Sequence, residues 1–317
     1  MRQFWVVFPL LVLLVSVIIG GCGDSEESNA ERYISEGINS LEQGNHDKAI
    51  EEFTEALEID SFSSIAYYNR ALAYTMKYRN DLAITDYTKA IELDPNMTKA
   101  YINRGISYMV EDQFELAITD YTKAIELDPA SVKAYSDRAM AYLYTEEYEL
   151  AITDYNKAIE IDPNLADLYL YRGIVHSAQN ECDLAILDYE MSIELDPNQS
   201  RVYYERGVCY ERQNEYELAI GDYTRAIELD PNNMLAILRR AFNYHYIGDY
   251  ERAIVDYTQA IEFNPEQAEV YYNRGLAFKE LGKLDEALTD LQKALTLTGN
   301  LEFIDEINNA IQELTDS

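Results

Sequence analysis

The chain is poor in the residues that break helices and in those that bind metals. Its 317 residues include 13 Gly, 7 Pro, 3 Cys and 3 His. So few helix breakers predict long stretches of regular structure. His46, His176 and His245 share no spacing that is typical of a metal site, and the sequence has no phosphate-binding glycine loop and no nucleophile with a neighbouring base. We therefore predict a protein that is not an enzyme and that has no cofactor and no bound metal.

Basic residues are scarce as well. The 25 Lys and Arg residues face 58 Asp and Glu residues, which gives a net charge of −33. Nucleic-acid binding requires cationic side chains that neutralise phosphates, so a nucleic-acid partner is not expected. A disordered acidic chain is excluded too, because 48% of the residues are hydrophobic and 12% are aromatic. A folded chain of this length is expected to form either two domains or a repeat solenoid.

The first residues are typical of an export signal. The charged start Met1-Arg2-Gln3 precedes an apolar run over residues 4–19, which is short for a helix that must cross roughly 30 Å of hydrocarbon. The run ends in Ile19-Gly20-Gly21-Cys22, which resembles the lipobox of bacterial lipoproteins. The resemblance implies a signal peptide over residues 1–21 and a lipid on Cys22.

Residues 22–29 are then expected to form a polar tether between the lipid and the folded part. Arg2 precedes the apolar run, whereas Asp24 and Glu26 follow it, and positive charge stays on the cytoplasmic side. We expect a protein of the cell envelope that is lipid-anchored and faces outward. An uncleaved membrane anchor with an incidental cysteine is the alternative.

Prolines mark a repeat in the rest of the chain. They stand at positions 95, 129, 163, 197, 231 and 265, so each interval is 34 residues. A fixed interval of this size predicts a repeat array. Eight repeats in phase with the prolines cover residues 30–63, 64–97, 98–131, 132–165, 166–199, 200–233, 234–267 and 268–301.

Each repeat is predicted to be a hairpin of two helices. In the third repeat Tyr101, Gly105 and Tyr108 form one helical stripe, and Tyr121 belongs to a second stripe that begins at Ala117. The proline ends the second helix, because it cannot continue the hydrogen-bond ladder but is well suited to start the next helix. Small residues recur in both helices where they must approach closely. The chain is therefore expected to be all-α.

The pattern is similar to that of the tetratricopeptide repeat family, which asks for aromatic residues, small residues and a proline at fixed positions. The second repeat satisfies it with Tyr67, Ala71, Tyr74, Ala83, Tyr87, Ala90 and Pro95. The resemblance covers residues 30–301 and implies a right-handed α-α superhelix, a solenoid of eight hairpins. Residues 302–317 carry one apolar stripe from Phe303 to Leu314 and are expected to form a capping helix.

The resemblance also implies that the first helices line a concave groove for peptides or partner domains. The candidate groove residues are Tyr68, Asn69, Lys99, Ile102, Asn103, Ile106, Lys133, Asp137, Met140, Leu170, Tyr204, Leu238, Tyr272 and Asn273. For Tyr68, Tyr204 and Tyr272, packing between adjacent first helices is an equally weighted alternative. The carboxylate clamp of chaperone-binding members is incomplete here, so that ligand is not predicted.

An arginine in the first helix and an aspartate 16 residues later recur with the repeat. We predict a guanidinium–carboxylate pair within each of these hairpins, with an arginine row for anionic ligands as the less favoured alternative. The residues are Arg70 with Asp86, Arg104 with Asp120, Arg138 with Asp154, Arg172 with Asp188, Arg206 with Asp222, Arg240 with Asp256, and Arg274 with Asp290.

Two cysteines and one histidine fall at positions of the repeat that are expected to be internal. Antiparallel packing can bring Cys182 and Cys209 together, so both a disulfide and two buried thiols stay open, and the thiols are favoured. His176 occupies an aromatic position and is expected to be a core residue.

These patterns lead to one functional prediction and one alternative. We predict a non-catalytic module that binds a peptide or partner protein in the groove, at the cell envelope. Because of the acidic excess, the partner is expected to be basic or neutral. The alternative is a scaffold subunit of an envelope assembly, such as one for pili, secretion or outer-membrane biogenesis.

Overall fold

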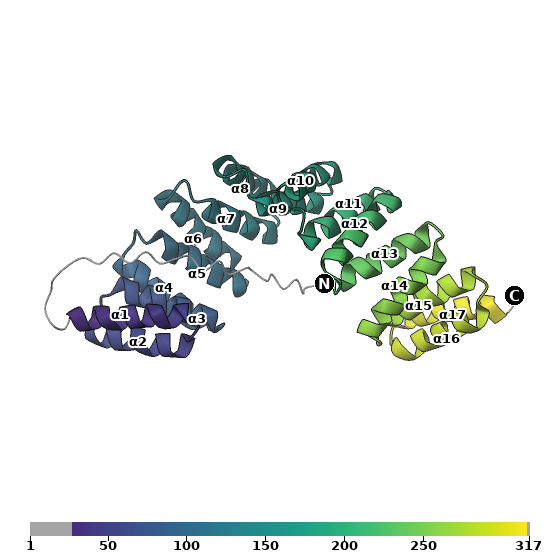
Figure 1. Ribbon diagram of the computed structural model, residues 1–317, viewed down its shortest axis with the longest axis horizontal. Coiled ribbons are helices and arrows are strands. Elements are labelled where there is room, and N and C mark those ends of the chain that lie inside the picture. Colours follow the sequence, from purple (N-terminus) through teal and green to yellow (C-terminus); the bar gives the residue numbers. More distant parts are fainter. Residues whose placement is uncertain (1–26, 316–317) are drawn as a thin grey trace. The chain divides into compact units, whose positions relative to one another are not determined.

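A computed structural model describes residues 27–315, and within this range the chain forms 17 helices and no strand (Figure 1). The prediction of an all-α chain is confirmed. The helices are α1 Glu27–Glu42, α2 His46–Ile59, α3 Ser64–Met76, α4 Asn80–Leu93, α5 Thr98–Val110, α6 Phe114–Leu127, α7 Val132–Tyr144, α8 Tyr148–Ile161, α9 Ala166–Ala178, α10 Cys182–Leu195, α11 Ser200–Arg212, α12 Tyr216–Leu229, α13 Met234–Tyr246, α14 Tyr250–Phe263, α15 Ala268–Glu280, α16 Leu284–Leu297 and α17 Leu301–Thr315.

The N-terminal predictions fall mostly outside this range. The signal peptide over 1–21 and the lipidation site Cys22 lie outside the described residues. The predicted tether is corrected at one end, because α1 begins at Glu27 and residues 27–29 are therefore helical. Within residues 27–315, no helix is both long enough and apolar enough to cross a membrane.

The two helices of each hairpin are joined by a turn that uses a left-handed residue. After α3, the amide of Tyr78 donates to Thr75 and the amide of Arg79 donates to Tyr74, which closes the last helical turn. The left-handed position recurs in every repeat, at Gly44, Tyr78, Asp112, Glu146, Asn180, Asn214, Gly248 and Gly282. Three of these are glycine, which adopts a positive φ without strain.

From the second repeat onward, consecutive hairpins are joined by a turn that contains aspartate or asparagine before proline. In the second repeat the amide of Asp94 donates to Ala90 at 2.8 Å, and the Asp94 carboxylate accepts from the amide of Asn96 at 3.0 Å. Pro95 then prevents the helix from continuing. The capped turn and the proline together end a second helix every 34 residues, so the hairpins have the same length.

The chain divides into two compact units, one ending at Ser107 and the other beginning at Tyr108. In the N-terminal unit, α2 packs against both α1 and α3. Phe53 on α2 is fully buried with Ala49 and Ala73, and Ile34 and Ile38 of α1 pack against them. Leu57 and Ala66 extend the core towards the next hairpin.

In the C-terminal unit the same packing recurs from one hairpin to the next. The third aromatic position of the repeat is fully buried at Tyr155, Tyr189, Tyr223 and Tyr257. The small residue of the first helix lies against this ring, and a Cβ on Gly173 would come within 2.6 Å of Tyr189 Cε1. Tyrosines of the second aromatic position, such as Tyr142 and Tyr210, are only half-buried, because they lie over arginine side chains near the surface.

The last helix covers the end of the array, as predicted. Ile307 and Leu314 of α17 are buried in one cluster with Leu291 of α16, and Phe303 and Ile311 pack against that cluster. The opposite face of α17 is exposed and polar. An amphipathic helix at this place keeps the apolar side of repeat eight from contact with water.

Candidate partner-binding surface

In the N-terminal unit, the structure separates the predicted groove residues into buried and accessible ones. Lys99 is exposed, and Asn103 and Ile106 are partly exposed. Asn69 and Ile102 are buried, with exposed fractions of 3% and 8%. Asn69 donates from Nδ2 to the carbonyl of Ile65, at 2.8 Å, in its own helix.

Tyr68 joins two first helices in this unit. Its hydroxyl accepts a hydrogen bond of 3.0 Å from Asn103 Nδ2 on α5, and its ring lies 5.9 Å from that of Tyr87. Burial raises the pKa of Tyr68 to about 12. The alternative of packing between adjacent first helices therefore describes Tyr68.

In the C-terminal unit, three more of the predicted groove residues are buried, namely Asp137, Met140 and Leu170. Leu170 belongs to the cluster that includes Val202 of α11. The prediction that these three residues line the groove was therefore wrong, as it was for Asn69 and Ile102. A side chain enclosed by its neighbours offers no surface to a ligand. Lys133 is exposed, and Tyr204, Leu238, Tyr272 and Asn273 are partly exposed.

Tyr204 and Tyr272 resemble Tyr68 in their contacts. The ring of Tyr204 lies 5.9 Å from Tyr223. Tyr272 contacts α17 twice, because its ring meets Phe303 edge to face at 5.2 Å and its hydroxyl lies 3.2 Å from Glu306 Oε1. Burial, helped by Glu306, raises the pKa of Tyr272 to about 12. Both side chains hold neighbouring helices together and present only part of their surface.

Asp137 is a buried carboxylate on the inner side of α7. Lys133, one turn earlier, lies 3.0 Å from its Oδ2. Burial raises the pKa of Asp137 above its usual value, and the ammonium of Lys133 opposes this effect only in part. Asn69, Asn103 and Asn273 occupy the same position in other repeats, and an amide there carries no charge to bury.

An aromatic and charged cluster around Arg201 was missed by the groove prediction. The guanidinium carbon of Arg201 on α11 lies 5.3 Å from the ring centroid of Tyr171 on α9, and Arg201 Nε lies 3.5 Å from Glu205 Oε1. Burial raises the pKa of the Glu205 carboxyl, and the nearby arginines Arg201, Arg212 and Arg239 oppose it. Tyr171 and Glu205 take the position that asparagine has elsewhere, so departure from the repeat was the available signal.

A second network was missed in the following repeat. Arg239 on α13 donates to Glu211 Oε1 on α11 at 2.6 Å. The other oxygen of Glu211 accepts from Asn243 at 2.8 Å and from the hydroxyl of Tyr223 at 2.9 Å. The carboxylate thus links three helices. Glu211 and Arg239 each occur once in the chain at their repeat position, so no periodic signal marks the ion pair at the centre of the network.

The predicted arginine–aspartate pairs are brought together across the hairpins. Arg138 donates from Nε to one oxygen of Asp154 at 2.7 Å and from Nη2 to the other at 2.8 Å, and both side chains are largely buried. Arg138 Nη1 reaches back to Thr122 Oγ1 of the previous repeat at 2.9 Å. The same two-point contact joins Arg70 to Asp86, Arg172 to Asp188, Arg206 to Asp222, Arg240 to Asp256 and Arg274 to Asp290.

These pairs leave the guanidinium groups little capacity for an external anion. In each, Nε and Nη2 are engaged by the carboxylate, and in most Nη1 bonds to the previous repeat. The hydrogen bonds to Asp154 raise the pKa of Arg138, which fixes its charge. The contacts favour the structural role over an anion-binding row.

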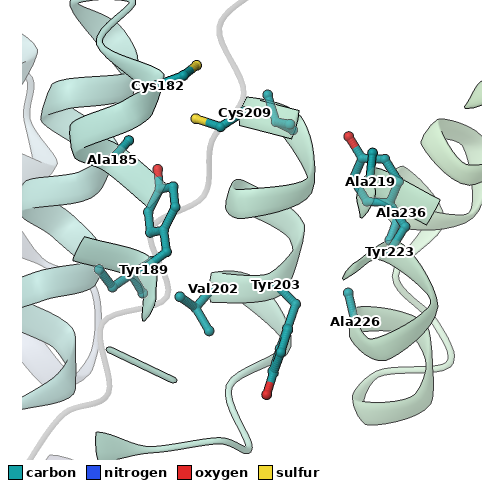
Figure 2. Close-up of a cluster of buried hydrophobic side chains, with 12 residues drawn as sticks. Cys182, Ala185, Tyr189, Val202, Tyr203, Cys209, Ala219, Tyr223, Ala226 and Ala236 are labelled. Carbon is teal, nitrogen blue, oxygen red and sulfur yellow. The ribbon is translucent and has the colours of Figure 1, made fainter. Parts of the chain in front are cut away.

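The cysteines face one another as free thiols. Cys182 on α10 and Cys209 on α11 are both buried and unbridged. Figure 2 shows their sulfur atoms pointing toward each other beside Ala185 and Tyr189. Cys209 also lies 3.6 Å from Ser177 Oγ, and burial raises the pKa of its thiol to about 12. A thiol that stays protonated is a poor nucleophile.

His176 is largely enclosed but not isolated. Its Nδ1 lies 2.9 Å from Glu181 Oε2 and its Nε2 lies 3.9 Å from Asp188 Oδ2. Across residues 27–315, no three His, Cys, Asp or Glu side chains are grouped so that they could hold a metal ion.

Comparison with known families identifies the repeat. The model described as tetratricopeptide repeat matches residues 64–97, 98–131, 132–165, 200–233 and 268–298, and a second model of that description matches residues 30–62. A model described as TPR repeat matches residues 242–282. These matches cover more than half of the chain, so the protein belongs to the tetratricopeptide repeat family.

Solved structures share this fold. A tetratricopeptide repeat protein from Parabacteroides merdae is 20% identical with a TM-score of 0.57, and the match covers 80% of this chain and 99% of that one. The PilF protein of Pseudomonas aeruginosa is 19% identical with a TM-score of 0.57, over 67% and 96% of the two chains. MamA is 29% identical with a TM-score of 0.48, over 51% and 94%. No curated protein matches the sequence.

The described helices therefore form a superhelical repeat of the tetratricopeptide type. Proteins of this family generally mediate protein–protein interaction, and the fold is typically a non-catalytic scaffold.

Proposed function

We propose that the chain binds a peptide or an extended segment of a partner protein along the inner side of its first helices. One observation carries the proposal. Partly exposed side chains recur at two matching positions of the first helices: Asn103 in the N-terminal unit corresponds to Asn273 in the C-terminal unit, and Ile106 corresponds to Ile174 and Leu276. A repeated row of this kind can contact a partner at intervals of one repeat.

The charge of the chain supports a basic or neutral partner. The net charge is −33, and two basic side chains of this surface already have acidic partners, since Lys133 pairs with Asp137 and Arg239 with Glu211. A cationic segment is attracted by the remaining excess of carboxylates, whereas an acidic one is repelled.

We further propose that this binding takes place at the cell envelope, with the chain held to the membrane by a lipid on Cys22. The support is the sequence Ile19-Gly20-Gly21-Cys22 after an apolar run, with Arg2 before that run and acidic residues after it. A Cys22→Ala chain is expected to lose its membrane association. Unchanged membrane association in that variant would contradict the lipid anchor.

Site-specific cross-linking in intact cells tests the binding proposal. A photoreactive amino acid replaces Ile106 in the full-length chain, and the matched control replaces Leu116, an exposed residue of the second helix α6. We expect a protein adduct from position 106 and not from position 116. Adducts from the control position alone, or from neither position, would contradict a binding surface on the first helices.

A further inference from the structure

The outer face of α10 carries a continuous apolar stripe. Leu184, Leu187, Met191 and Leu195 follow one another at helical spacing, and their exposed fractions are 46%, 58%, 40% and 36%. The stripe runs over three helical turns, about 16 Å at the α-helical rise. Side chains of this size in one row are an unusual surface for a helix that faces water.

The other repeats interrupt this stripe with polar residues. The position of Leu187 holds threonine in α4, α6 and α8, and glycine in α12. The position of Met191 holds a basic residue in the same helices, namely Lys89, Lys123, Lys157 and Arg225. In α10 both positions are apolar, so repeat five alone among the eight joins its leucines into one surface.

Packing of the array does not require these side chains. The opposite face of α10 places Cys182, Ala185, Tyr189 and Ser192 in the core, and all four are buried. Figure 2 shows the first three of these directed toward α11. The helix is therefore held by one face while the other remains available.

The substitution at Met191 also changes the local charge. In the neighbouring helix α8, Lys157 lies 2.8 Å from Glu160, and the same contact joins Arg225 to Glu228 in α12. In α10, Met191 replaces this basic residue. Glu194, which corresponds to Glu160 and Glu228, therefore lacks the basic neighbour that those two residues have one turn earlier. No basic residue occurs in α10.

The remaining carboxylates of α10 differ in their engagement. Asp188 is held by Arg172, and Asp183 accepts from Gln213 at 2.7 Å. In most other repeats the position of Glu190 holds a threonine that accepts a hydrogen bond from the arginine of the next repeat, as Thr122 does from Arg138. Glu190 interacts with the corresponding arginine, Arg206. Glu194, exposed and beside Met191, is the carboxylate whose cationic partner another molecule can supply.

We propose that the outer face of α10 is a docking site for an amphipathic helix of a partner protein with lysine or arginine beside its apolar face. Leucine-sized side chains of that helix would pack into the stripe as ridges into grooves, and a basic residue would pair with Glu194. A second copy of this chain fits less well, because two acidic faces would meet across the interface. This site lies outside the proposed groove and does not depend on it.

The test uses a synthetic helical peptide of leucine and lysine, with the leucines on one face, titrated against the full-length chain. The variant Leu187→Thr/Met191→Lys restores at α10 the residues that α8 carries at Thr153 and Lys157, so its fold is preserved. We expect the peptide to bind the unmodified chain and to bind this variant at least tenfold more weakly. A peptide with glutamate in place of lysine is expected not to bind.

A charge-matched control separates the stripe from general attraction. Gly221→Lys adds one positive charge at the corresponding outer position of α12, where a new side chain meets no atom within 4 Å. Its affinity for the peptide is expected to equal that of the unmodified chain. Equal weakening by both variants, no weakening by either, or binding of the glutamate peptide would overturn the proposal. Self-association that Leu187→Thr/Met191→Lys abolishes would overturn it too, in favour of a second copy.

Discussion

The pair between Arg138 and Asp154 joins the two helices of its hairpin through two hydrogen bonds. We expect Arg138→Met to destabilise α7 and α8 by about 3–5 kcal/mol, because it leaves a buried carboxylate without its cation. The combined variant with Asp154→Leu is expected to lose less than the sum of the two single changes. Amide hydrogen exchange of α7 and α8 measures the effect, since repeat arrays do not unfold in two states.

The same experiment has a clear negative outcome. If the two single changes add without coupling, the pair contributes nothing specific to the hairpin. An exposed pair such as Lys157 with Glu160 serves as the control, because exposed pairs typically contribute about 0–1 kcal/mol.

Asp137 gives a pH-dependent prediction. Burial raises the pKa of this carboxyl in the folded chain, so its protonated form stabilises the fold at low pH, and that stabilisation is lost as the pH rises through the raised value. We therefore expect Asp137→Asn to increase thermal stability at neutral pH. The advantage should shrink as the pH falls to roughly 4, where the carboxyl is protonated in the unfolded chain as well.

Melting curves of the full-length chain across this pH range measure the difference. Asp305→Asn removes the same charge from the exposed face of α17 and is the control. An Asp137→Asn chain that is less stable than the unmodified chain at neutral pH, or a difference that does not vary with pH, would show that the carboxylate is well compensated.

Periodic contacts of single residues could be predicted from the sequence, whereas unique ones could not. The pairing of Arg138 with Asp154 was predictable because the 16-residue interval recurs in repeat after repeat. The network around Glu211 depends on Glu211 and Arg239, which each appear only once at their repeat positions. The burial of Met140 and Leu170 was missed because it depends on how closely the next hairpin packs, which no residue of their own helix determines.

At the scale of the secondary-structure elements, the turn between α3 and α4 contains a strained residue, and a substitution can relieve the strain. Tyr78 has φ of 57° and an exposed fraction of 89%, so its ring gains little from packing. The left-handed conformation is disfavoured for residues with a Cβ. We expect Tyr78→Gly to stabilise the hairpin of α3 and α4 by about 1 kcal/mol.

Hydrogen exchange of the amides in α3 and α4 reports this gain. Asn214→Gly in the turn after α11 is the comparison, with a smaller expected gain because asparagine tolerates a positive φ. A loss of protection in Tyr78→Gly would mean that the tyrosine stabilises the turn through contacts that outweigh the strain.

Gly221 in the middle of α12 allows the reverse substitution, in which glycine is replaced by a residue with a Cβ. A Cβ at this position meets no atom within 4 Å, so alanine adds helix propensity without a clash. We expect Gly221→Ala to stabilise α12 by about 0.5–1 kcal/mol, measured as slower amide exchange. Faster exchange in α12 would indicate that the backbone needs glycine there.

The helices themselves were predictable from the sequence because two local signals agree. Apolar stripes indicate where each helix faces its neighbours, and a proline after six of the eight second helices marks where the helix ends. The start of α1 at Glu27 was not predicted, because residues 27–29 carry no apolar periodicity and lie before the first repeat.

At the scale of the whole molecule, the acidic excess predicts how binding responds to salt. Capture of a basic partner at position 106 is expected to weaken as ionic strength rises, because screening shortens the range of the attraction. A yield that stays constant with salt would indicate a mainly apolar interface, as expected for a permanent scaffold subunit. Irradiation of the photoreactive chain together with its captured partner in buffers of increasing salt, followed by quantification of the adduct, measures this dependence.

The measurement that tests the central claim most directly is cross-linking from two positions of the same row within the C-terminal unit. Photoreactive residues replace Tyr171 on α9 and Asn273 on α15 in separate full-length chains, and Val255 on the outer side of α14 is the control. If the first helices hold one extended partner, both positions capture the same protein and Val255 does not. Capture of unrelated proteins at the two positions, or equal capture at Val255, would contradict a binding surface built from the first helices.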